Sequence, residues 1–200
     1  MKDWLLYEKE CLNAGYKVVC GVDEAGRGPL AGPVCAAAVI LREGEIIEGA
    51  NDSKKLSEKK RENLFEIIKN NALSYGVAFS DEKEIDDLNI LNATYLAMKR
   101  AVSRLKIKPD IILVDGNRVP DFGIFAKPII KGDASSMSIA CASILAKVTR
   151  DRYMKELDKQ YPAYGFEKHK GYGTKFHIEK LKKYGYSPIH RKSFLKNIIG

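Results

Sequence analysis

The sequence has 200 residues, of which 45% are hydrophobic and 30% charged, and its formal net charge is +8 at pH 7. This composition excludes a disordered chain, and the longest apolar run, residues 31–41, is too short for a membrane-spanning helix, which needs about 18 residues. The first residues are charged and lack the apolar stretch of a signal peptide, so we expect a cytoplasmic protein.

Hydrophobic periodicity predicts helices and short strands along the whole chain. Amphipathic spacing predicts helices over residues 3–13, 58–70, 89–105, 136–160 and 174–184. Apolar runs predict strands over residues 18–23, 34–41, 72–79, 111–114 and 126–130. Because few residues separate the first two strands, we expect them to pair in antiparallel fashion.

This order of elements is typical of one α/β domain, residues 1–200, with a mixed sheet flanked by helices. Residues 161–200 are expected to form a helical, basic, substrate-binding appendage. Residues 141–200 contain 14 Lys or Arg and 5 Asp or Glu, whereas residues 1–140 contain 20 and 21. A basic surface attracts phosphates, which favours a polyanionic partner, although a solvated basic helix face would have the same composition.

The four cysteines show no C-x-x-C spacing and stand mostly in apolar surroundings. We therefore expect small buried hydrophobic residues in a reducing compartment, rather than zinc ligands or disulfides. The four are Cys11, Cys20, Cys35 and Cys141.

Three apolar strand-like runs end in acids, namely Asp23 with Glu24, Asp115, and Asp133. Ligand sites gather at strand ends in α/β sheets, and carboxylates that converge there bind either protons or a hard cation. Magnesium prefers oxygen ligands, and four carboxylates suit two such ions ~3.5–4 Å apart. Cys20, in the apolar run before Asp23, is the one His or Cys within five residues of these acids, and a single such residue disfavours zinc. Each acid taken alone is better explained as a turn residue or a helix cap, and the three strand ends together favour a metal site.

The adjacent acids Asp23 and Glu24 present a geometric difficulty, because consecutive strand residues point to opposite faces. Both reach one site only if the strand ends or kinks between them, and the glycines at 26 and 28 make such a break plausible. Glycines on both sides of Arg27 also allow backbone N–H groups to approach a ligand closely.

Several motifs occur in a familiar order: "GVDEAGRGPLAGPV", "DSKKL", "LVDG", "KGDA", "ASILAKVTRD" and "HKGYGT". Together they resemble the prokaryotic ribonuclease HII family, the type 2 ribonucleases H. The resemblance runs from about residue 18 to "IHRKSF" at residues 189–194. It implies a ribonuclease H-like mixed sheet flanked by helices, with a helical C-terminal part.

The resemblance also implies roles for individual residues. The four acids would hold two divalent ions, Mg²⁺ or Mn²⁺. Gly26, Arg27 and Gly28 would contact the 2′-OH of a ribonucleotide through the backbone, and Tyr172 would lie against the sugar of the following deoxyribonucleotide. Such enzymes cut on the 5′ side of a ribonucleotide at an RNA–DNA junction and leave a 3′-hydroxyl and a 5′-phosphate.

Basic side chains outside these motif positions are candidate phosphate contacts. Lys54 and Lys55 contact the backbone of the substrate or are simply solvated. Lys147 and Arg150 share a helix face with Ser143, and they contact phosphate or pair with acids on the same helix, Asp151 or Glu156.

The loop histidine His169 has two interpretations, a proton carrier near the site or a residue hydrogen-bonded to backbone. For the whole chain we expect a monomeric endoribonuclease acting on RNA/DNA hybrids and on single ribonucleotides in duplex DNA. One alternative is a resolvase-like DNA nuclease of the same fold, which would be indifferent to a 2′-OH. Another is a nucleic-acid-binding protein without catalysis, which would tolerate neutral residues in place of the acids.

Overall fold

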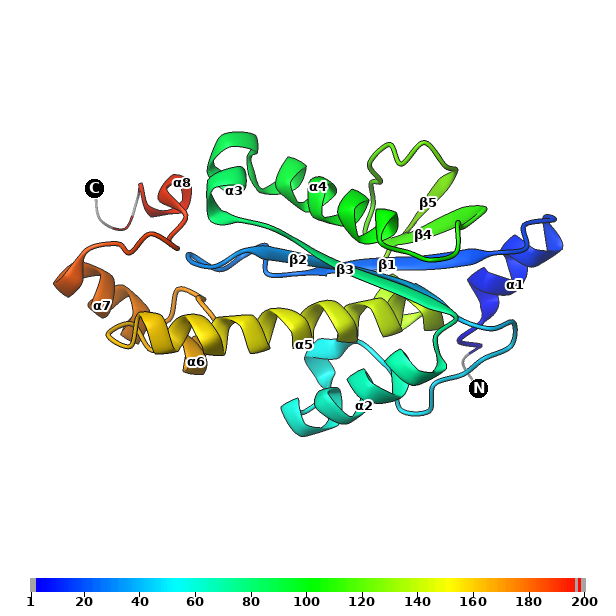
Figure 1. Ribbon diagram of the computed structural model, residues 1–200, viewed down its shortest axis with the longest axis horizontal. Helices are drawn as coiled ribbons and strands as arrows, with labels where there is room; N and C mark the ends of the chain where they lie inside the picture. The colour runs from blue at the N-terminus through cyan, green and yellow to red at the C-terminus, as the bar shows by residue number, and fades with distance from the viewer. Residues whose placement is uncertain (1–2, 197, 199–200) are drawn as a thin grey trace.

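The computed structural model describes residues 3–196 and 198, and within them five strands form one mixed sheet in the order β3-β2-β1-β4-β5 (Figure 1). The strands are β1 (Val19–Ala25), β2 (Val34–Ile40), β3 (Ser74–Ser80), β4 (Ile111–Asp115) and β5 (Ala126–Ile129). Strand β1 is parallel to β4, and β4 to β5, whereas β2 is antiparallel to both β1 and β3. The predicted mixed sheet and the predicted antiparallel pair are confirmed.

Helices cover both faces of the sheet. They are α1 (Leu6–Asn13), α2 (Glu58–Asn71), α3 (Glu82–Leu88), α4 (Ile90–Ser103), α5 (Met137–Gln160), α6 (Phe166–His169), α7 (Lys175–Tyr184) and α8 (Lys192–Leu195), with 3₁₀ turns η1 (Ser53–Lys55) and η2 (Gly132–Ala134). Helices α2 and α5 lie on one face, and α3 and α4 on the other (Figure 1). The described residues include no helix long and apolar enough to cross a membrane.

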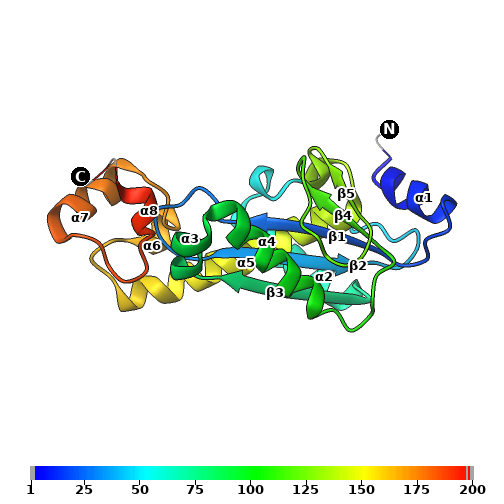
Figure 2. The same ribbon diagram turned by 90° about the horizontal axis from the view of Figure 1, so that it is seen from above.

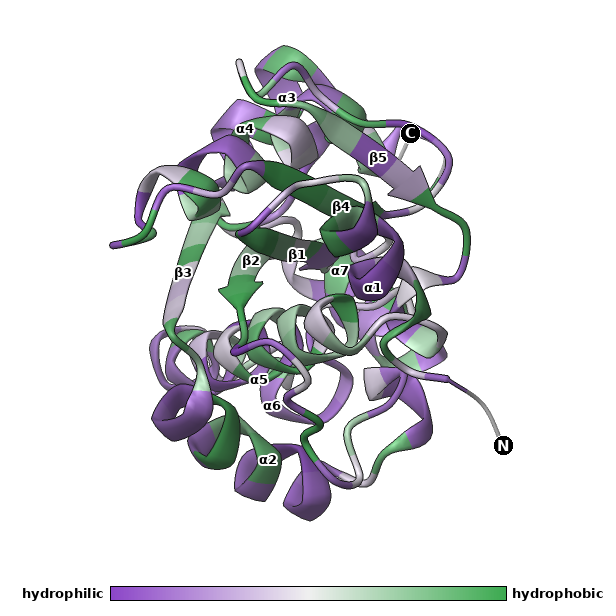
Figure 3. Cartoon of the chain, turned by 90° about the vertical axis from the view of Figure 1, so that its right-hand side faces the viewer, coloured by the Kyte–Doolittle hydropathy of each residue, from purple (hydrophilic) through white to green (hydrophobic). Residues whose placement is uncertain are grey.

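Strand β2 is buried along its whole length because both of its faces are covered. Cys35, Ala37 and Val39 join the core formed with α2 and α5, whereas the intervening residues 34–40 of even number join the core formed with α4. Figure 3 shows hydrophobic residues concentrated on the central strands, with hydrophilic residues on the outer surface of α2. A two-sided core of this kind explains why the strand sequences are continuous apolar runs.

Sequence periodicity missed the three short helices α3, α6 and α8, which have four to seven residues. The start of α3 is fixed by a capping box in which the Asp81 carboxylate accepts from the Glu84 N–H at 2.8 Å. Such short helices depend on end contacts and tertiary packing rather than on a repeating apolar face.

The C-terminal helices gather at one end of the molecule, opposite α1 (Figure 2). Phe166, Leu181 and Ile189 pack there against Met154 near the end of α5 and Ala31 in the loop after β1. This packing brings residues from the last part of the chain against the loop between β1 and β2, residues 26–33, which we call the glycine-rich loop.

All four cysteines are free and buried, which confirms the prediction that they are small core residues. Burial raises the pKa of each thiol, in the case of Cys20 to about 12.

Candidate active site

Three of the four predicted acids come together at the carboxyl end of the parallel strands. Val22 pairs with Val114 in register, so Asp23 on β1 and Asp115 at the end of β4 are neighbours across the sheet. Asp133 follows β5 in η2. Each acid has one carboxylate oxygen that lies within 4.8 Å of a carboxylate oxygen of each of the other two acids. Among the described residues, these three acids form a group able to hold a metal ion.

The three carboxylates lie where ionised acids are costly. Burial raises the pKa of Asp23 well above its ordinary value, and the charges of Glu24 and Asp115 raise it further. Burial likewise raises the pKa of Asp133, with Asp115 as the next cause. The Asp115 Oδ1 accepts the Gly132 N–H at 2.7 Å, which fixes the acid against η2. An all-oxygen group of closely spaced carboxylates fits a hard divalent cation, which would remove this repulsion.

Glu24 is not a member of this group of three. Strand β1 keeps its register with β2 through Ala25, so the expectation that the strand ends or kinks between Asp23 and Glu24 is wrong. The Glu24 Oε1 lies 3.5 Å from Arg27 Nη1. Burial raises the pKa of Glu24, Arg27 lowers it, and the charge of Asp115 raises it again. Glu24 is therefore at the border of the acidic group, close enough to interact with Asp115.

The loop with η1 supplies residues that sequence reasoning did not assign to the site. Asp52 raises the pKa of Asp133 by its charge and by a hydrogen bond, after the larger effects of burial and Asp115. Ser143 on α5 donates a hydrogen bond toward Asp23, and its Oγ lies 2.9 Å from that of Ser53. No sequence signal marks these contacts, because they depend on how α5 and η1 pack against β1.

A cavity of about 220 Å³ adjoins the acids. Its lining residues come from the end of β1, the loop after it, η1, α5 and the loop before α7, and they are Glu24, Ala25, Gly26, Arg27, Gly28, Ser53, Lys54, Ser143, Lys147 and Tyr172. Six of the eight predicted substrate contacts are in this set, and Lys55 and Arg150 are not. The cavity thus brings the glycine-rich loop, Tyr172 and two lysines beside one another.

The lysines of the cavity face acids. Burial lowers the pKa of Lys54, but the charges of Asp133 and Asp23 outweigh this effect and raise it overall. Lys147 Nζ lies 2.7 Å from an oxygen of Asp151, which is the pairing alternative noted from the sequence. Lys55 is largely exposed, and its amino group lies 3.9 Å from Asp52.

The prediction that Arg150 contacts phosphate is wrong. Its side chain is 1% exposed, and its guanidinium donates to the carbonyls of Pro33 at 2.9 Å, Lys170 at 3.0 Å and Ala31 at 3.2 Å. Arg150 therefore binds the loop after β1 from inside the protein. His169 is also held by backbone, since its Nε2 lies 2.9 Å from the Tyr164 carbonyl and its Nδ1 accepts from Gly171.

A second buried arginine determines how the glycine-rich loop is oriented. Arg191 donates to the carbonyls of Gly26 at 2.6 Å, Arg27 at 2.9 Å and Gly32 at 2.8 Å. Because a peptide unit is planar and trans, the first two contacts turn the N–H groups of Arg27 and Gly28 away from Arg191. Those two N–H groups have no acceptor among residues 3–196 and 198. They are free to donate to a bound molecule.

Glycine is required at 26 for two reasons. Its φ is +98°, which side chains with a Cβ avoid, and an added Cβ would lie 2.0 Å from Arg150 Nε. At Gly28, an added Cβ would lie 3.7 Å from the Tyr172 ring. The glycine-rich loop and Tyr172 are therefore direct neighbours.

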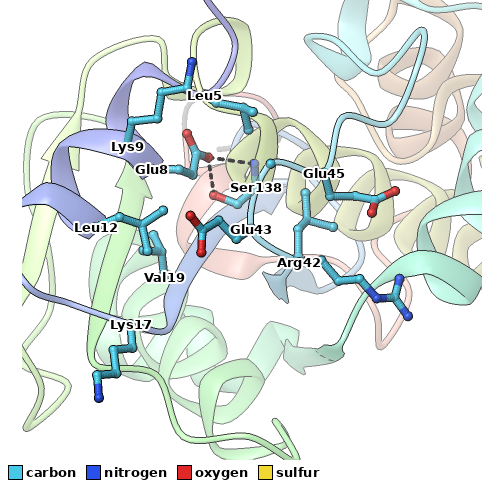
Figure 4. A pocket seen from close by; sticks show the side chains of 12 residues that line it. Leu5, Glu8, Lys9, Leu12, Lys17, Val19, Arg42, Glu43, Glu45 and Ser138 are labelled. Carbon is cyan, nitrogen blue, oxygen red and sulfur yellow. Dashed lines mark hydrogen bonds between the residues drawn. The ribbon is translucent and has the colours of Figure 1, made fainter.

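A different cavity, of about 140 Å³, lies between α1 and the loop after β2 (Figure 4). Val19, at the start of β1, lines it, whereas the acids lie toward the other end of that strand. The Glu8 Oε1 accepts from the Ser138 N–H at 3.0 Å and from the hydroxyls of Ser138 and Ser136. Glu8 thus binds α1 to the first turn of α5, which is a structural role.

Comparisons with known proteins decide the family. A model of the ribonuclease HII family matches residues 20–197. The chain belongs to the ribonuclease HII family. It is 63% identical over 192 residues to the ribonuclease HII of Caldicellulosiruptor bescii, covering 96% of this chain and 93% of that one. It is 60% identical over 194 residues to the ribonuclease HII of Acetivibrio thermocellus, covering 97% of this chain and 76% of that one.

Solved structures agree with this family. The ribonuclease H2 of Pyrococcus horikoshii is 31% identical, with a TM-score of 0.76, and the match covers 92% of this chain and 97% of that one. The ribonuclease HII of Archaeoglobus fulgidus, solved in complex with PCNA, is 26% identical, with a TM-score of 0.74 and coverage of 88% and 94%. The fold is therefore ribonuclease H-like, and this ribonuclease HII family member is a metal-dependent ribonuclease H endonuclease acting on the RNA of hybrids.

Proposed function

We propose that this enzyme cuts duplex DNA on the 5′ side of an embedded ribonucleotide, as well as the RNA strand of RNA/DNA hybrids, and leaves a 3′-hydroxyl and a 5′-phosphate. The observation that supports it is the position of the acidic group directly beside a cavity lined by the glycine-rich loop and Tyr172. Hydrolysis and recognition of the sugar would then occur in adjacent places. The 2′-OH is the group that distinguishes RNA from DNA at one nucleotide.

Asp23, Asp115 and Asp133 would hold divalent metal, Mg²⁺ or Mn²⁺ and in total two ions, with Glu24 at the border of the group. When bound, such ions activate a water and neutralise charge at the scissile phosphate. The residues of this chain keep the carboxylates close, exclude bulk water by burial, and place Lys54 where its positive charge faces the same acids.

Recognition of the ribose would use the main chain. The outward N–H groups of Arg27 and Gly28 would donate to the 2′-oxygen, and the Tyr172 ring, 44% exposed, would pack against the next sugar. Because neither contact involves a base edge, the enzyme would recognise the ribose whatever the base sequence of the duplex.

The duplex would extend over the basic C-terminal part, residues 161–200, where α7 has exposed lysines at 175, 182 and 183. Lys54, Lys55 and Lys147 would contact phosphates. We infer that the enzyme acts as a monomer in the cytoplasm, and the free, buried cysteines agree with a reducing compartment.

One experiment tests this function. A labelled DNA duplex with a single ribonucleotide is compared with the all-DNA duplex, with Mg²⁺, with Mn²⁺ and with a chelator. We expect metal-dependent cutting 5′ of the ribonucleotide in the first duplex alone. Cutting of both duplexes would support a resolvase-like nuclease instead, and binding without cutting would support a non-catalytic binding protein.

The Asp133→Asn variant completes the experiment. We expect it to bind the ribonucleotide duplex much as the unaltered enzyme does and to lose most cleavage. Full turnover by this variant at saturating Mg²⁺ would contradict the metal-binding role of Asp133.

A further inference from the structure

The segment of residues 187–191, between α7 and α8, touches both elements that would read the substrate. It runs beside the loop after β1 in both Figure 1 and Figure 2. His190 forms an antiparallel bridge with Ala31, the Arg191 N–H donates to the Leu30 carbonyl at 2.9 Å, and the Leu30 N–H donates to the Gly171 carbonyl at 2.8 Å. Three parts of the chain distant in sequence are thus joined beside the cavity.

A chain of hydrogen bonds with one fixed direction leads from this segment to Tyr172. The Ser187 N–H can only donate, so His190 Nδ1, 2.9 Å away, accepts and carries no proton. His190 is then protonated on Nε2 and donates to His177 Nε2 at 3.0 Å. His177 must therefore carry its proton on Nδ1, which donates to the Tyr172 carbonyl at 2.9 Å. Each bond determines the tautomer needed for the next.

The surroundings keep both rings neutral. His177 is 0% exposed and His190 2%, and burial lowers the pKa of each to about 4. The His169 ring is stacked on that of His177, with centroids 4.4 Å apart, and the backbone contacts of His169 hold it in place. The other tautomer of His177, with its proton on Nε2, would direct the Nδ1 lone pair at the carbonyl oxygen of Tyr172, so the tautomer protonated on Nδ1 is strongly preferred.

Arg191, the residue after His190, orients the glycine-rich loop, which is the other element that would contact the substrate. Arg191 is 0% exposed and binds the carbonyls of Gly26 and Arg27, which turns the N–H groups of Arg27 and Gly28 away from Arg191, and both residues line the cavity. Burial and the charge of Arg150 lower the pKa of Arg191 to about 9.

We propose that the adjacent residues His190 and Arg191 set the relative position of the two substrate-reading elements. Arg191 orients the main chain of the glycine-rich loop, and His190 acts through His177 on the carbonyl of Tyr172. All three are positioning residues that touch no substrate atom. The inference rests on the proposed function, in which this loop and Tyr172 read consecutive sugars.

The first test concerns Arg191→Lys, which keeps the positive charge but cannot reproduce the forked guanidinium contacts. Binding to the single-ribonucleotide duplex and to the all-DNA duplex is measured by fluorescence anisotropy in metal-free buffer. We expect the preference for the ribonucleotide duplex to fall roughly fivefold to tenfold, with little change for the all-DNA duplex, because only hydrogen bonds to the 2′-OH are lost. An unchanged preference would overturn the role of Arg191.

Tyr164→Phe is the matched control. It removes the 3.0 Å hydrogen bond to the Gly185 carbonyl from the same C-terminal core, and Tyr164 packs on His190, yet it belongs to neither set of contacts. We expect it to lower the melting temperature while the binding preference stays unchanged. A loss of preference equal to that in Arg191→Lys would show that general loosening explains both, and would overturn the proposal.

The second test is a double-mutant cycle of His177→Leu with Tyr172→Ala, measured as kcat/KM on the single-ribonucleotide duplex. We expect His177→Leu to reduce kcat/KM roughly fivefold alone but less than about twofold when Tyr172 is already alanine, because its effect passes through Tyr172. Additive losses would show a purely structural role. If the unaltered enzyme does not cut this duplex at all, the proposed function itself fails.

A measurement on the unaltered protein guards against variants that do not fold. Nitrogen-15 NMR of the histidine rings reports which nitrogen is protonated. We expect protons on Nδ1 of His177 and on Nε2 of His190. The opposite tautomer of either residue would overturn the directed chain to Tyr172.

Discussion

We predict that Asp23→Asn raises the thermal stability of the metal-free protein while it removes cleavage. Asp23 is 4% exposed, and its carboxylate shares a region 4.8 Å across with those of Asp115 and Asp133. Asparagine has the same shape and can still accept the Glu24 N–H that Asp23 binds at 2.7 Å. The substitution therefore removes charge with little change of packing.

The magnitude follows from the spacing. Two unit charges 4.8 Å apart repel by roughly 3.5 kcal/mol at an effective dielectric constant of about 20. The charge of Lys54 and partial proton uptake reduce the net effect, so we expect a gain of about 2 kcal/mol, or roughly 4–8 °C in melting temperature. Because the folded pKa of Asp23 lies above its ordinary 3.8, the repulsion is present at pH 8 and disappears near pH 4.

Thermal unfolding at pH 8, in chelator and in saturating Mg²⁺, measures the effect beside the cleavage assay. Mg²⁺ should raise the melting temperature of the unaltered protein more than that of Asp23→Asn. Asp110→Asn is the control, because Asp110 precedes β4 at the end opposite Asp115 and accepts the N–H groups of Lys17 and Val18 at 2.9 Å. It should lower stability equally in both buffers and leave cleavage unchanged. A lower melting temperature of metal-free Asp23→Asn at pH 8, or its full cleavage activity, would refute the reasoning.

Three further predictions concern stability and binding. His177 and His190 are neutral when folded, with pKa values of about 4, whereas unfolded histidine binds protons below about pH 6.5. Their contribution is therefore present above pH 6.5 and lost as pH falls toward 4. We expect the Asp23→Asn variant, in which the repulsion among the acids is already reduced, to lose about 2–4 kcal/mol of unfolding free energy in urea between pH 7 and pH 5, and equal midpoints at the two pH values would contradict this. Gly21→Ala should lower the free energy of unfolding by about 3 kcal/mol or more in the same assay, because the added Cβ would lie 2.2 Å from the carbonyl carbon of Ser138 in α5. An unchanged unfolding midpoint would show that α5 moves easily to make room. Duplex binding should weaken steeply between low and high salt, and a flat dependence would argue against the basic C-terminal part as the contact.

The helices and strands with strong apolar patterns were predictable from the sequence. The helix after Ser57 is one case, because the Ser57 side chain accepts the Lys60 N–H and an amphipathic run follows. The convergence of Asp23 and Asp115 was also readable, since an acid at the end of each apolar run becomes a pair when the two strands are parallel neighbours.

Contacts that satisfy buried charge were not predictable. In the sequence, Arg150 and Arg191 look like exposed basic residues, yet both are buried. Their guanidinium groups donate hydrogen bonds to backbone carbonyls more than a hundred residues away, which compensates for the loss of water. The sequence indicated no role for Asp52, because its approach to Asp133 depends on tertiary packing. The regular path of β1 through Glu24 is set by its pairing with β2, which overrides the break suggested by the nearby glycines.

The four buried thiols also have a practical use. With all four at most 4% exposed and their pKa values raised, the folded enzyme offers maleimide reagents almost no thiolate. A cysteine introduced at an exposed position of α7 outside its lysines, such as Glu179, would therefore carry a fluorescent dye selectively, without removal of the native cysteines. Energy transfer from that dye to a labelled duplex would report how the enzyme approaches its substrate in real time.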